Sequence, residues 1–190
     1  EMALMKAVRG AELGLDTLNA APLSDAPLLE RLQAQDDRRI FTVFEAIKQG
    51  VSVDEIFQIT KIDRWFLHKL KKLSDFEARI EAGGLTDKDY REGKRLGYPD
   101  EALCRLAGVS AVPGMEMHYK MVDTCAAEFD AETPYFYSSF DADCESRAFP
   151  RTGKPVVMVL GSGPIRIGQG IEFDYSSVHC VWTLRELGYD

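Results

Sequence analysis

The chain has 190 residues, of which 45% are hydrophobic and 28% are charged, and its formal net charge at pH 7 is −8. This is the composition of a globular protein with enough apolar residues for one or two cores, and the acidic balance disfavours general binding to nucleic acid or to an anionic membrane surface. The uninterrupted apolar runs are far shorter than the roughly 20 residues of a membrane-spanning helix.

The beginning of the chain predicts helices separated by an irregular connection. Residues 1–10 have apolar side chains at helical spacing, whereas residues 11–27 combine glycine and proline with short apolar residues, which is typical of a loop or linker. The helical pattern resumes over residues 25–49 and ends at Gly50.

Two helix starts carry clear capping signals. Ser52 is followed three residues later by Glu55, which is the pattern of a capping box, and Asp63 is a suitable cap for a helix over residues 64–82. We expect Trp65 and Phe66 to be buried at the start of this longer helix. Its apolar stripe is Phe66, Leu70, Leu73, Phe76 (or Glu77) and Ile80.

After this helix the pattern becomes less regular. Further helices are predicted over residues 86–96 and 100–107, residues 119–123 favour an extended conformation, and residues 130–153 have the composition of a loop held in place by its aromatic side chains. The cysteines and histidines show no CxxC pair or other usual zinc spacing, so we predict reduced thiols and no metal site. They are Cys104, Cys125, Cys144, Cys180, His68, His118 and His179.

The rest of the chain is organised around residues 155–190, which predict a strand, a glycine-rich loop and a helix. The apolar run 156–160 is typical of a strand buried on both faces, and the helix has a plausible C-terminal cap at Gly188. A strand, loop and helix in this order open an α/β sheet, where ligands bind at the carboxyl ends of the strands. The loop reads Gly161-Ser-Gly163-Pro-Ile-Arg166-Ile-Gly168-Gln169-Gly170.

This loop fits neither of two common phosphate-binding motifs. Arg166 stands where the dinucleotide-binding fingerprint requires its third glycine, and the lysine of the P-loop is absent. The longer string from Gly161 to His179 nevertheless resembles one family closely, the large subunit of carbamoyl-phosphate synthetase. Two further strings in the family's order support the resemblance, and they are Ile62-Asp-Arg-Trp-Phe-Leu67 and Tyr119-Lys-Met-Val-Asp-Thr-Cys-Ala-Ala-Glu-Phe129.

The resemblance implies a mainly α fold. Residues 1–20 would be the tail of the first ATP-grasp unit, and residues 21–150 a helical oligomerisation domain. Residues 151–190 would form the strand–glycine loop–helix unit that starts the second pre-ATP-grasp domain, so the chain is expected to be an excised piece. Many relatives have an additional helix where this chain has only residues 108–120, so its structure there is expected to differ.

The resemblance also implies a function. The whole enzyme, an ATP-dependent ligase, makes carbamoyl phosphate from bicarbonate, glutamine-derived ammonia and two ATP, for arginine and pyrimidine synthesis. We expect no catalysis and no cofactor in this chain alone, because the domains that bind ATP and Mg²⁺ (or Mn²⁺) lie elsewhere. The expected partners are further copies of the chain and a glutaminase small subunit, in the cytoplasm, with no nucleic acid and no membrane.

Within this chain, the glycine loop is the expected functional element. Carbamate is a small anion that decomposes in water, so its passage needs close backbone and few strongly basic groups. Unhindered glycine backbone and the neutral donor and acceptor of a glutamine side chain suit such a path. The residues expected to line it are Gly163, Arg166, Gly168, Gln169 and Gly170.

A DNA-binding helix-turn-helix is the alternative interpretation. Residues 52–73 combine a capped short helix, a turn and a longer helix, which is the arrangement of a recognition motif. The acidic net charge and the appended strand–loop–helix unit count against this interpretation. The basic side chains available for phosphate contacts are Lys61, Arg64, Lys69, Lys71 and Lys72.

Overall fold

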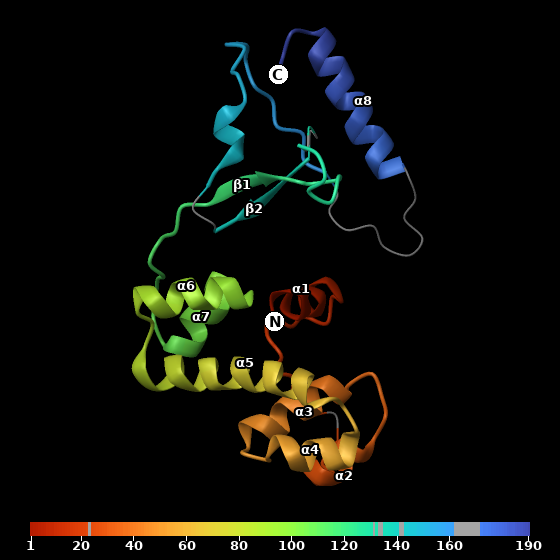
Figure 1. The fold of residues 1–190 in the computed structure, drawn as a ribbon, viewed down its shortest axis with the longest axis vertical. Coiled ribbons are helices and arrows are strands. Elements are labelled where there is room, and N and C mark those ends of the chain that lie inside the picture. The colour runs from red at the N-terminus through yellow and green to blue at the C-terminus, as the bar shows by residue number, and fades with distance from the viewer. Residues whose placement is uncertain (23, 131, 133–134, 141–142, 162–171) are drawn as a thin grey trace. The chain divides into compact units, whose positions relative to one another are not determined.

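The computed structural model describes residues 1–190 except residues 23, 131, 133–134, 141–142 and 162–171 (Figure 1). The described residues form a mainly helical protein, as predicted, and they divide into two compact units, Glu1–Glu116 and Met117–Asp190. The helices of the first unit are α1 (Met2–Gly10), α2 (Leu28–Gln33), α3 (Arg39–Lys48), α4 (Val53–Thr60), α5 (Arg64–Gly83), α6 (Asp87–Leu96) and α7 (Asp100–Ala107).

Three helices of the first unit begin where a polar side chain satisfies a free backbone N–H group. The side chain of Ser52 accepts a hydrogen bond from the N–H of Glu55 at the start of α4, and that of Asp63 accepts one from Trp65 at the start of α5. Thr86 forms a full capping box with Asp89 at the start of α6. These local bonds confirm the two predicted caps and explain why the helices begin at these positions.

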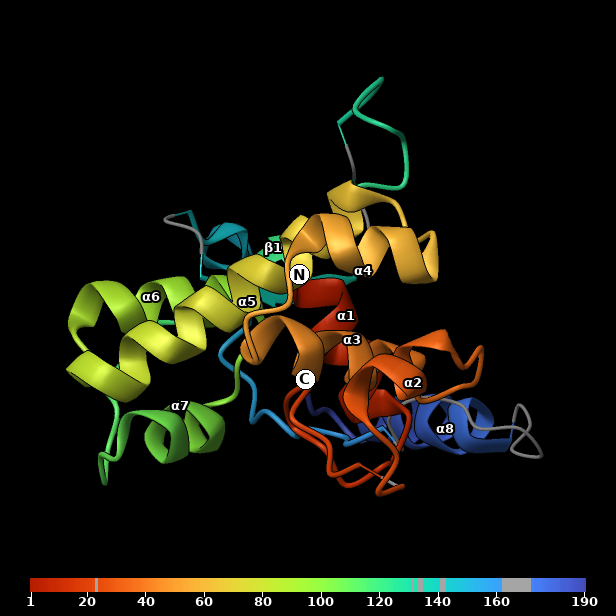
Figure 2. The same ribbon diagram turned by 90° about the horizontal axis from the view of Figure 1, so that it is seen from below.

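The long helix α5 is the centre of the core of the first unit. Helices α3, α4, α6 and α7 pack against it, as Figures 1 and 2 show. The buried face of α5 follows the predicted stripe from Leu70 onwards, and it consists of Leu67, Leu70, Leu73, Phe76, Glu77 and Ile80 together with Ser74. Burial of these apolar side chains against α3 provides the main driving force for folding of the unit.

Two predictions for this unit were wrong in detail. The pattern over residues 25–49 gives two helices, α2 and α3, because the chain leaves the helical conformation at Ala34. Trp65 and Phe66, expected to be buried, are 60% and 58% exposed. They lie in the first turn of α5, so they extend the apolar stripe beyond the part of the helix that the core covers.

One glycine allows α6 to approach its neighbours closely. A Cβ atom added to Gly93 would lie 2.7 Å from Leu103 Cδ2 on α7 and 2.9 Å from Phe76 Cζ on α5. Both distances are shorter than ordinary carbon–carbon contacts, so any larger residue would force the helices apart. Gly93 therefore determines how tightly α6 packs in the unit.

A buried carboxylate connects four segments of the first unit. Glu77 on α5 has no exposed surface, and its side chain accepts hydrogen bonds from Lys48 Nζ (2.8 Å), Asn19 Nδ2 (2.9 Å) and Tyr98 Oη (2.9 Å). Burial, and then the neighbouring Glu77 carboxylate, raise the pKa of Tyr98. The phenol therefore stays protonated and donates to the carboxylate. The network attaches the irregular segment around Asn19 to the helical core.

The second unit contains a two-stranded sheet, a short 3₁₀ turn and one helix in its described residues. Strands β1 (His118–Met121) and β2 (Phe136–Ser139) pair antiparallel, with His118 opposite Ser139 and Met121 opposite Phe136. The 3₁₀ turn η1 covers Glu145–Ala148, and α8 covers Glu172–Glu186. The extended conformation expected at residues 119–123 is confirmed for β1, whereas β2 lies inside the region predicted to be a loop.

Candidate functional site

The predicted glycine-loop residues lie outside the described part of the chain. Gly163, Arg166, Gly168, Gln169 and Gly170 all fall within residues 162–171, so their proposed role stays a prediction. The segments on both sides of the loop are described. They are the apolar run 156–160 before it and helix α8 after it.

The expected strand at 156–160 is not formed in this structure. Val156, Met158 and Leu160 are each 80% exposed, and the segment has no regular secondary structure. A strand buried on both faces needs neighbouring strands, and the extended segment β1 pairs with β2 and not with this run. Val178 and Val181 of α8 are 43% and 40% exposed.

Two backbone hydrogen bonds nevertheless connect this run to the end of α8. The N–H of Asp190 donates to the carbonyl oxygen of Pro155 (2.9 Å), and the N–H of Val157 donates to the carbonyl oxygen of Asp190 (2.7 Å). The two bonds enclose Val156 in the pattern of a parallel strand pair. The chain reverses after α8 at Gly188, whose φ of 88° suits glycine. The start of an α/β arrangement is therefore present in its hydrogen bonding.

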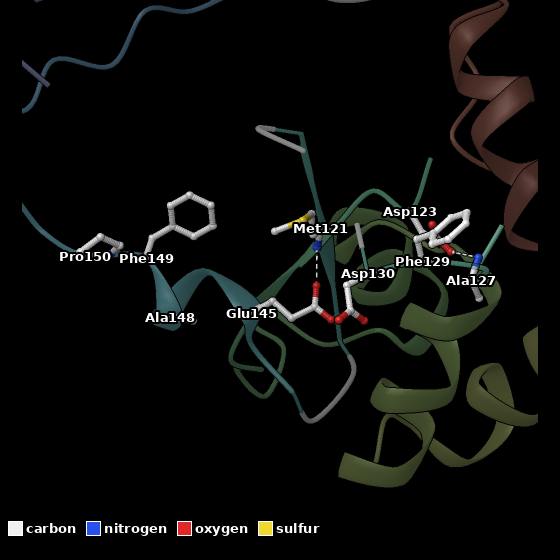
Figure 3. Close-up of a pocket in the computed structure, with 9 residues that line it drawn as sticks. All are labelled: Met121, Asp123, Ala127, Phe129, Asp130, Glu145, Ala148, Phe149 and Pro150. Carbon is white, nitrogen blue, oxygen red and sulfur yellow. Dashed lines mark hydrogen bonds between the residues drawn. The ribbon is translucent and has the colours of Figure 1, made fainter. Parts of the chain in front are cut away.

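A cavity of about 620 Å³ in the second unit combines carboxylates with apolar side chains (Figure 3). Two of its three carboxylates, those of Asp123 and Glu145, accept hydrogen bonds from the backbone. Asp123 accepts the N–H groups of Cys125 (2.8 Å) and Ala127 (2.7 Å), and Glu145 accepts that of Met121 (2.6 Å). The lining residues are Met121, Asp123, Ala127, Phe129, Asp130, Glu145, Ala148, Phe149 and Pro150.

The hydrogen bonds of Asp123 explain an unusual turn in the second unit. Ala126 and Ala127 have φ values of 52° and 60°, in the left-handed region that residues with a Cβ atom rarely adopt. Bonding of the Asp123 carboxylate to the backbone beyond it offsets that cost, as in an Asx turn. This cavity is therefore held together by its acidic residues, and across the described residues no cluster of three or more potential ligands could hold a metal ion.

The thiol of Cys144 lies next to two hydrogen-bonding groups. The nearby hydroxyl of Ser146, 3.1 Å from Sγ, and the backbone N–H of Tyr119 lower the pKa of its thiol. Both groups stabilise the thiolate by hydrogen bonding. None of the four cysteines forms a disulfide in the structure.

The first unit carries an apolar groove that sequence analysis did not predict. It has a volume of about 820 Å³ and lies between the start of α1, the beginning of α3 and the first half of α5, which Figure 2 shows side by side. Trp65 and Phe66 are among its lining residues, and their rings meet edge to face with the centroids 4.9 Å apart. The only sequence signal was two adjacent aromatic residues directly after a helix cap, which equally suits a buried position.

The helix pair α4–α5 does not present a free basic surface. Arg64 pairs with Asp54 (2.6 Å) and Lys71 pairs with Asp75 (2.6 Å). Lys69 and Lys72 both lie near Glu1. Because most of the cations expected to meet phosphate are already paired with carboxylates, the structure gives no support to DNA binding.

Comparison with known families gives a direct match to most of the chain. Residues 1–120 match the model described as "Carbamoyl-phosphate synthetase large chain, oligomerisation domain". The chain belongs to the carbamoyl-phosphate synthetase large-chain family. Residues 153–190 match a second model of this family, described as "Carbamoyl phosphate synthase preATP-grasp domain".

Individual relatives agree with this membership. The carbamoyl phosphate synthase large chain of Agathobacter rectalis is 44% identical over 201 residues, which covers 100% of this chain and 19% of the relative. That of Lachnoclostridium phytofermentans is 45% identical over 202 residues, with the same coverage. That of Methanosarcina barkeri is 45% identical over 167 residues, or 84% of this chain and 15% of the relative. The chain therefore spans about a fifth of the length of these relatives.

The alignments with the first two relatives extend over 201 and 202 residues, whereas this chain has 190 residues. Relatives therefore carry residues that it lacks, and we predicted this loss within residues 108–120. The structure has no regular element between the end of α7 and the start of β1. Val112 and Met115 pack there as partly buried side chains against the core.

Within the described residues of this family member, no helix combines the length and the apolar character needed to cross a membrane.

Proposed function

We propose that this chain provides the self-association domain of a carbamoyl phosphate synthase large chain and connects its two synthetase halves. The observation that carries the proposal is the match of residues 1–120, which include the whole compact first unit, to the family's oligomerisation domain. In the complete enzyme, the activity would be synthesis of carbamoyl phosphate from bicarbonate, glutamine-derived ammonia and two ATP. The product would serve arginine and pyrimidine synthesis in the cytoplasm.

The cofactors and the second partner of the complete enzyme would lie outside this chain. ATP and Mg²⁺ (or Mn²⁺) would bind to ATP-grasp domains, and a glutaminase small subunit would supply the ammonia. The chain alone would therefore neither hydrolyse ATP nor bind it tightly. Isothermal titration of the 190-residue chain with ATP and Mg²⁺ tests this point, and a dissociation constant in the micromolar range would contradict it.

The self-association proposal is tested by sedimentation velocity of the 190-residue chain over a wide concentration series. We expect a reversible increase of the sedimentation coefficient with concentration. The exposed apolar run 156–160 offers a competing cause, since unpaired extended backbone can pair between molecules. Val156→Lys together with Met158→Lys should abolish association through that run and leave association through the helical unit intact. A chain that stays monomeric at every concentration contradicts the proposal.

We also propose that the glycine loop lines a passage or active-site loop for carbamate in the complete enzyme. The match of residues 153–190 to the preATP-grasp domain supports this role, as does the parallel hydrogen-bond pattern next to the loop. In a complete large chain, Gly170→Leu should reduce carbamoyl phosphate formation more than bicarbonate-dependent ATP hydrolysis, because a bulky side chain would obstruct the path between the two steps. Equal loss of both activities would contradict the passage role.

A further inference from the structure

The connection between the two compact units follows directly after α7. Gly108, the first residue after this helix, lies in the left-handed region with a φ of 66°. The N–H of the next residue, Val109, donates to the carbonyl oxygen of Cys104 (3.0 Å), which is the longer of the two bonds of a Schellman cap. The direction in which the chain leaves α7 is therefore fixed, and the second unit begins at Met117.

Two apolar side chains attach this connection to the first unit. Val112 and Met115 are partly buried, and both pack against the core of that unit. Pro113, which lies between them, has a fixed φ and favours an extended conformation at Val112, so Gly114 is the most adaptable residue between the two contacts. Residues 109–115, which we call the strap, contain no helix or strand.

We propose that the strap is a conformational device that controls the length of the connection between the two units. While Val112 and Met115 stay packed on the core, the connection is short, and when they are released, it becomes long. The strap belongs to a single chain and does not depend on the proposed self-association. Its consequence does rest on the proposed function, because that function places this connection between the two synthetase halves.

Chain geometry gives the size of the effect. With the strap closed, the free part of the connection runs from Met115 to Met117, and an extended chain of that length spans about 7 Å at most. With the strap released, the free part begins at Gly108, and it then spans about 30 Å at most. Release therefore increases the reach of the connection about fourfold, which would widen the range of positions open to the second synthetase half.

The strap is placed to open before the rest of the first unit. Its two anchoring side chains keep part of their surface in contact with solvent, whereas core residues such as Leu73 on α5 and Leu103 on α7 have no exposed surface. Segments with few buried contacts open locally at a lower free energy than a packed core. Opening of the strap therefore does not require the helices to unfold.

The first experiment measures ¹⁵N relaxation of the 190-residue chain. We expect order parameters of about 0.85 for the amides of the strap in the wild type, as in the helices, and below about 0.6 in the double variant Val112→Ser, Met115→Ser. Met117→Ser is the matched control, because Met117 is 47% exposed and lies beyond the strap. It should leave the strap amides unchanged. Strap and helix amides are compared within one spectrum, so self-association does not alter the result.

The second experiment measures release by limited proteolysis with proteinase K, whose broad specificity tolerates the substitutions. Cleavage within the strap requires that it leaves the core, so the double variant should be cut there roughly 10-fold faster than the wild type or more. Mass spectrometry of the fragments locates the cuts. Cleavage within the exposed run 156–160 is the internal control and should proceed at the same rate in both proteins, while circular dichroism shows whether the helices are retained.

The outcomes decide on the strap alone. Wild-type order parameters below about 0.6 in the strap overturn the proposal, because the connection would then be long without any release. Equal order parameters and equal cleavage rates in the wild type and the double variant overturn it too, because Val112 and Met115 would then not hold the strap. If the double variant is unfolded, Val112→Ala decides by the same readouts, and wild-type behaviour overturns the proposal. Each of these failures leaves the proposed function standing, since that is tested by sedimentation.

Discussion

The buried carboxylate of Glu77 allows a quantitative test of what stabilises the first unit. In Glu77→Gln the side-chain volume is almost unchanged, but the charge that Lys48 Nζ meets at 2.8 Å is lost, and an amide group can no longer accept from all three donors. Hydrogen bonds to charged groups contribute about 1.5–3 kcal/mol each, and removing one partner of a buried ion pair costs about 3–5 kcal/mol.

The geometry places the expected loss toward the lower end of these ranges. The Lys48 side chain retains 28% of its surface in contact with solvent, so its ammonium group can be hydrated after the substitution. We therefore expect Glu77→Gln to reduce the free energy of unfolding by about 2–3 kcal/mol. Glu77→Ala, which also leaves a cavity and removes one hydrogen-bond acceptor each from Asn19 and Tyr98, should cost about 3–5 kcal/mol.

The assay is urea-induced unfolding followed by circular dichroism at pH 7, with Glu81→Gln as the control. Glu81 lies one turn further along α5 and its oxygen is 3.6 Å from the same Lys48 Nζ, but its side chain is 44% exposed. An exposed pair contributes about 0–1 kcal/mol, so this variant should unfold almost like the wild type. If Glu77→Gln costs no more than Glu81→Gln, the reasoning from burial is wrong.

Three further predictions follow from packing and charge in the first unit. Gly93→Ala should destabilise by about 1–3 kcal/mol in urea unfolding, because its Cβ atom would lie 2.7 Å from Leu103. The guanidinium of Arg31, which binds Glu45 through two hydrogen bonds, lowers the pKa of that carboxyl. The resulting stabilisation, about 1 kcal/mol at pH 7, should be complete above the unfolded-state pKa of about 4.3 and lost as the pH falls through the lower folded-state pKa. The unfolding free energies of Glu45→Gln and the wild type should therefore converge in acid. Trp65→Ala should change the unfolding free energy of the dissociated chain by less than about 1 kcal/mol in urea titrations at low concentration, because the ring is exposed.

Helix starts in this chain were predictable because their causes are local. Ser52 and Asp63 each bond a backbone N–H group two or three residues further on, so a short window of sequence contains the complete signal. The apolar stripe of α5 was predictable for the same reason, since its period is a property of the helix. The stripe was predicted to contain Phe76 or Glu77, and both of these side chains are buried in the structure.

The errors concern features that depend on distant parts of the chain. Phe66 continues the stripe of α5 by one turn, and only the position of the neighbouring helices decides that the core ends before it. The strand β2 forms because β1 pairs with it, and its sequence shows no clean alternation of apolar and polar residues. The apolar run 156–160 has good strand composition, but among the described residues it bonds only to Asp190 and is part of no sheet.

The candidate sites show the same limit. The glycine loop was found from a string of sequence, and its geometry stays a prediction because residues 162–171 lie outside the described part of the chain. The groove beside Trp65 arises from three helices that are distant in sequence, α1, α3 and α5, so no local pattern could have predicted it. Resemblance to a family therefore indicated the family of the chain, whereas the groove was found only in the structure.

The two hydrogen bonds between Asp190 and the backbone around Val156 determine the direction in which a second strand would run. Since they have the parallel pattern, a strand that began at Asp190 would run the same way as the run 156–160, with α8 as the crossover between them. Such crossovers are almost always right-handed, so the face of the sheet on which α8 lies would also be determined. The carboxyl ends of the two strands would then lie at the same edge of the sheet, which is where ligands bind in such folds.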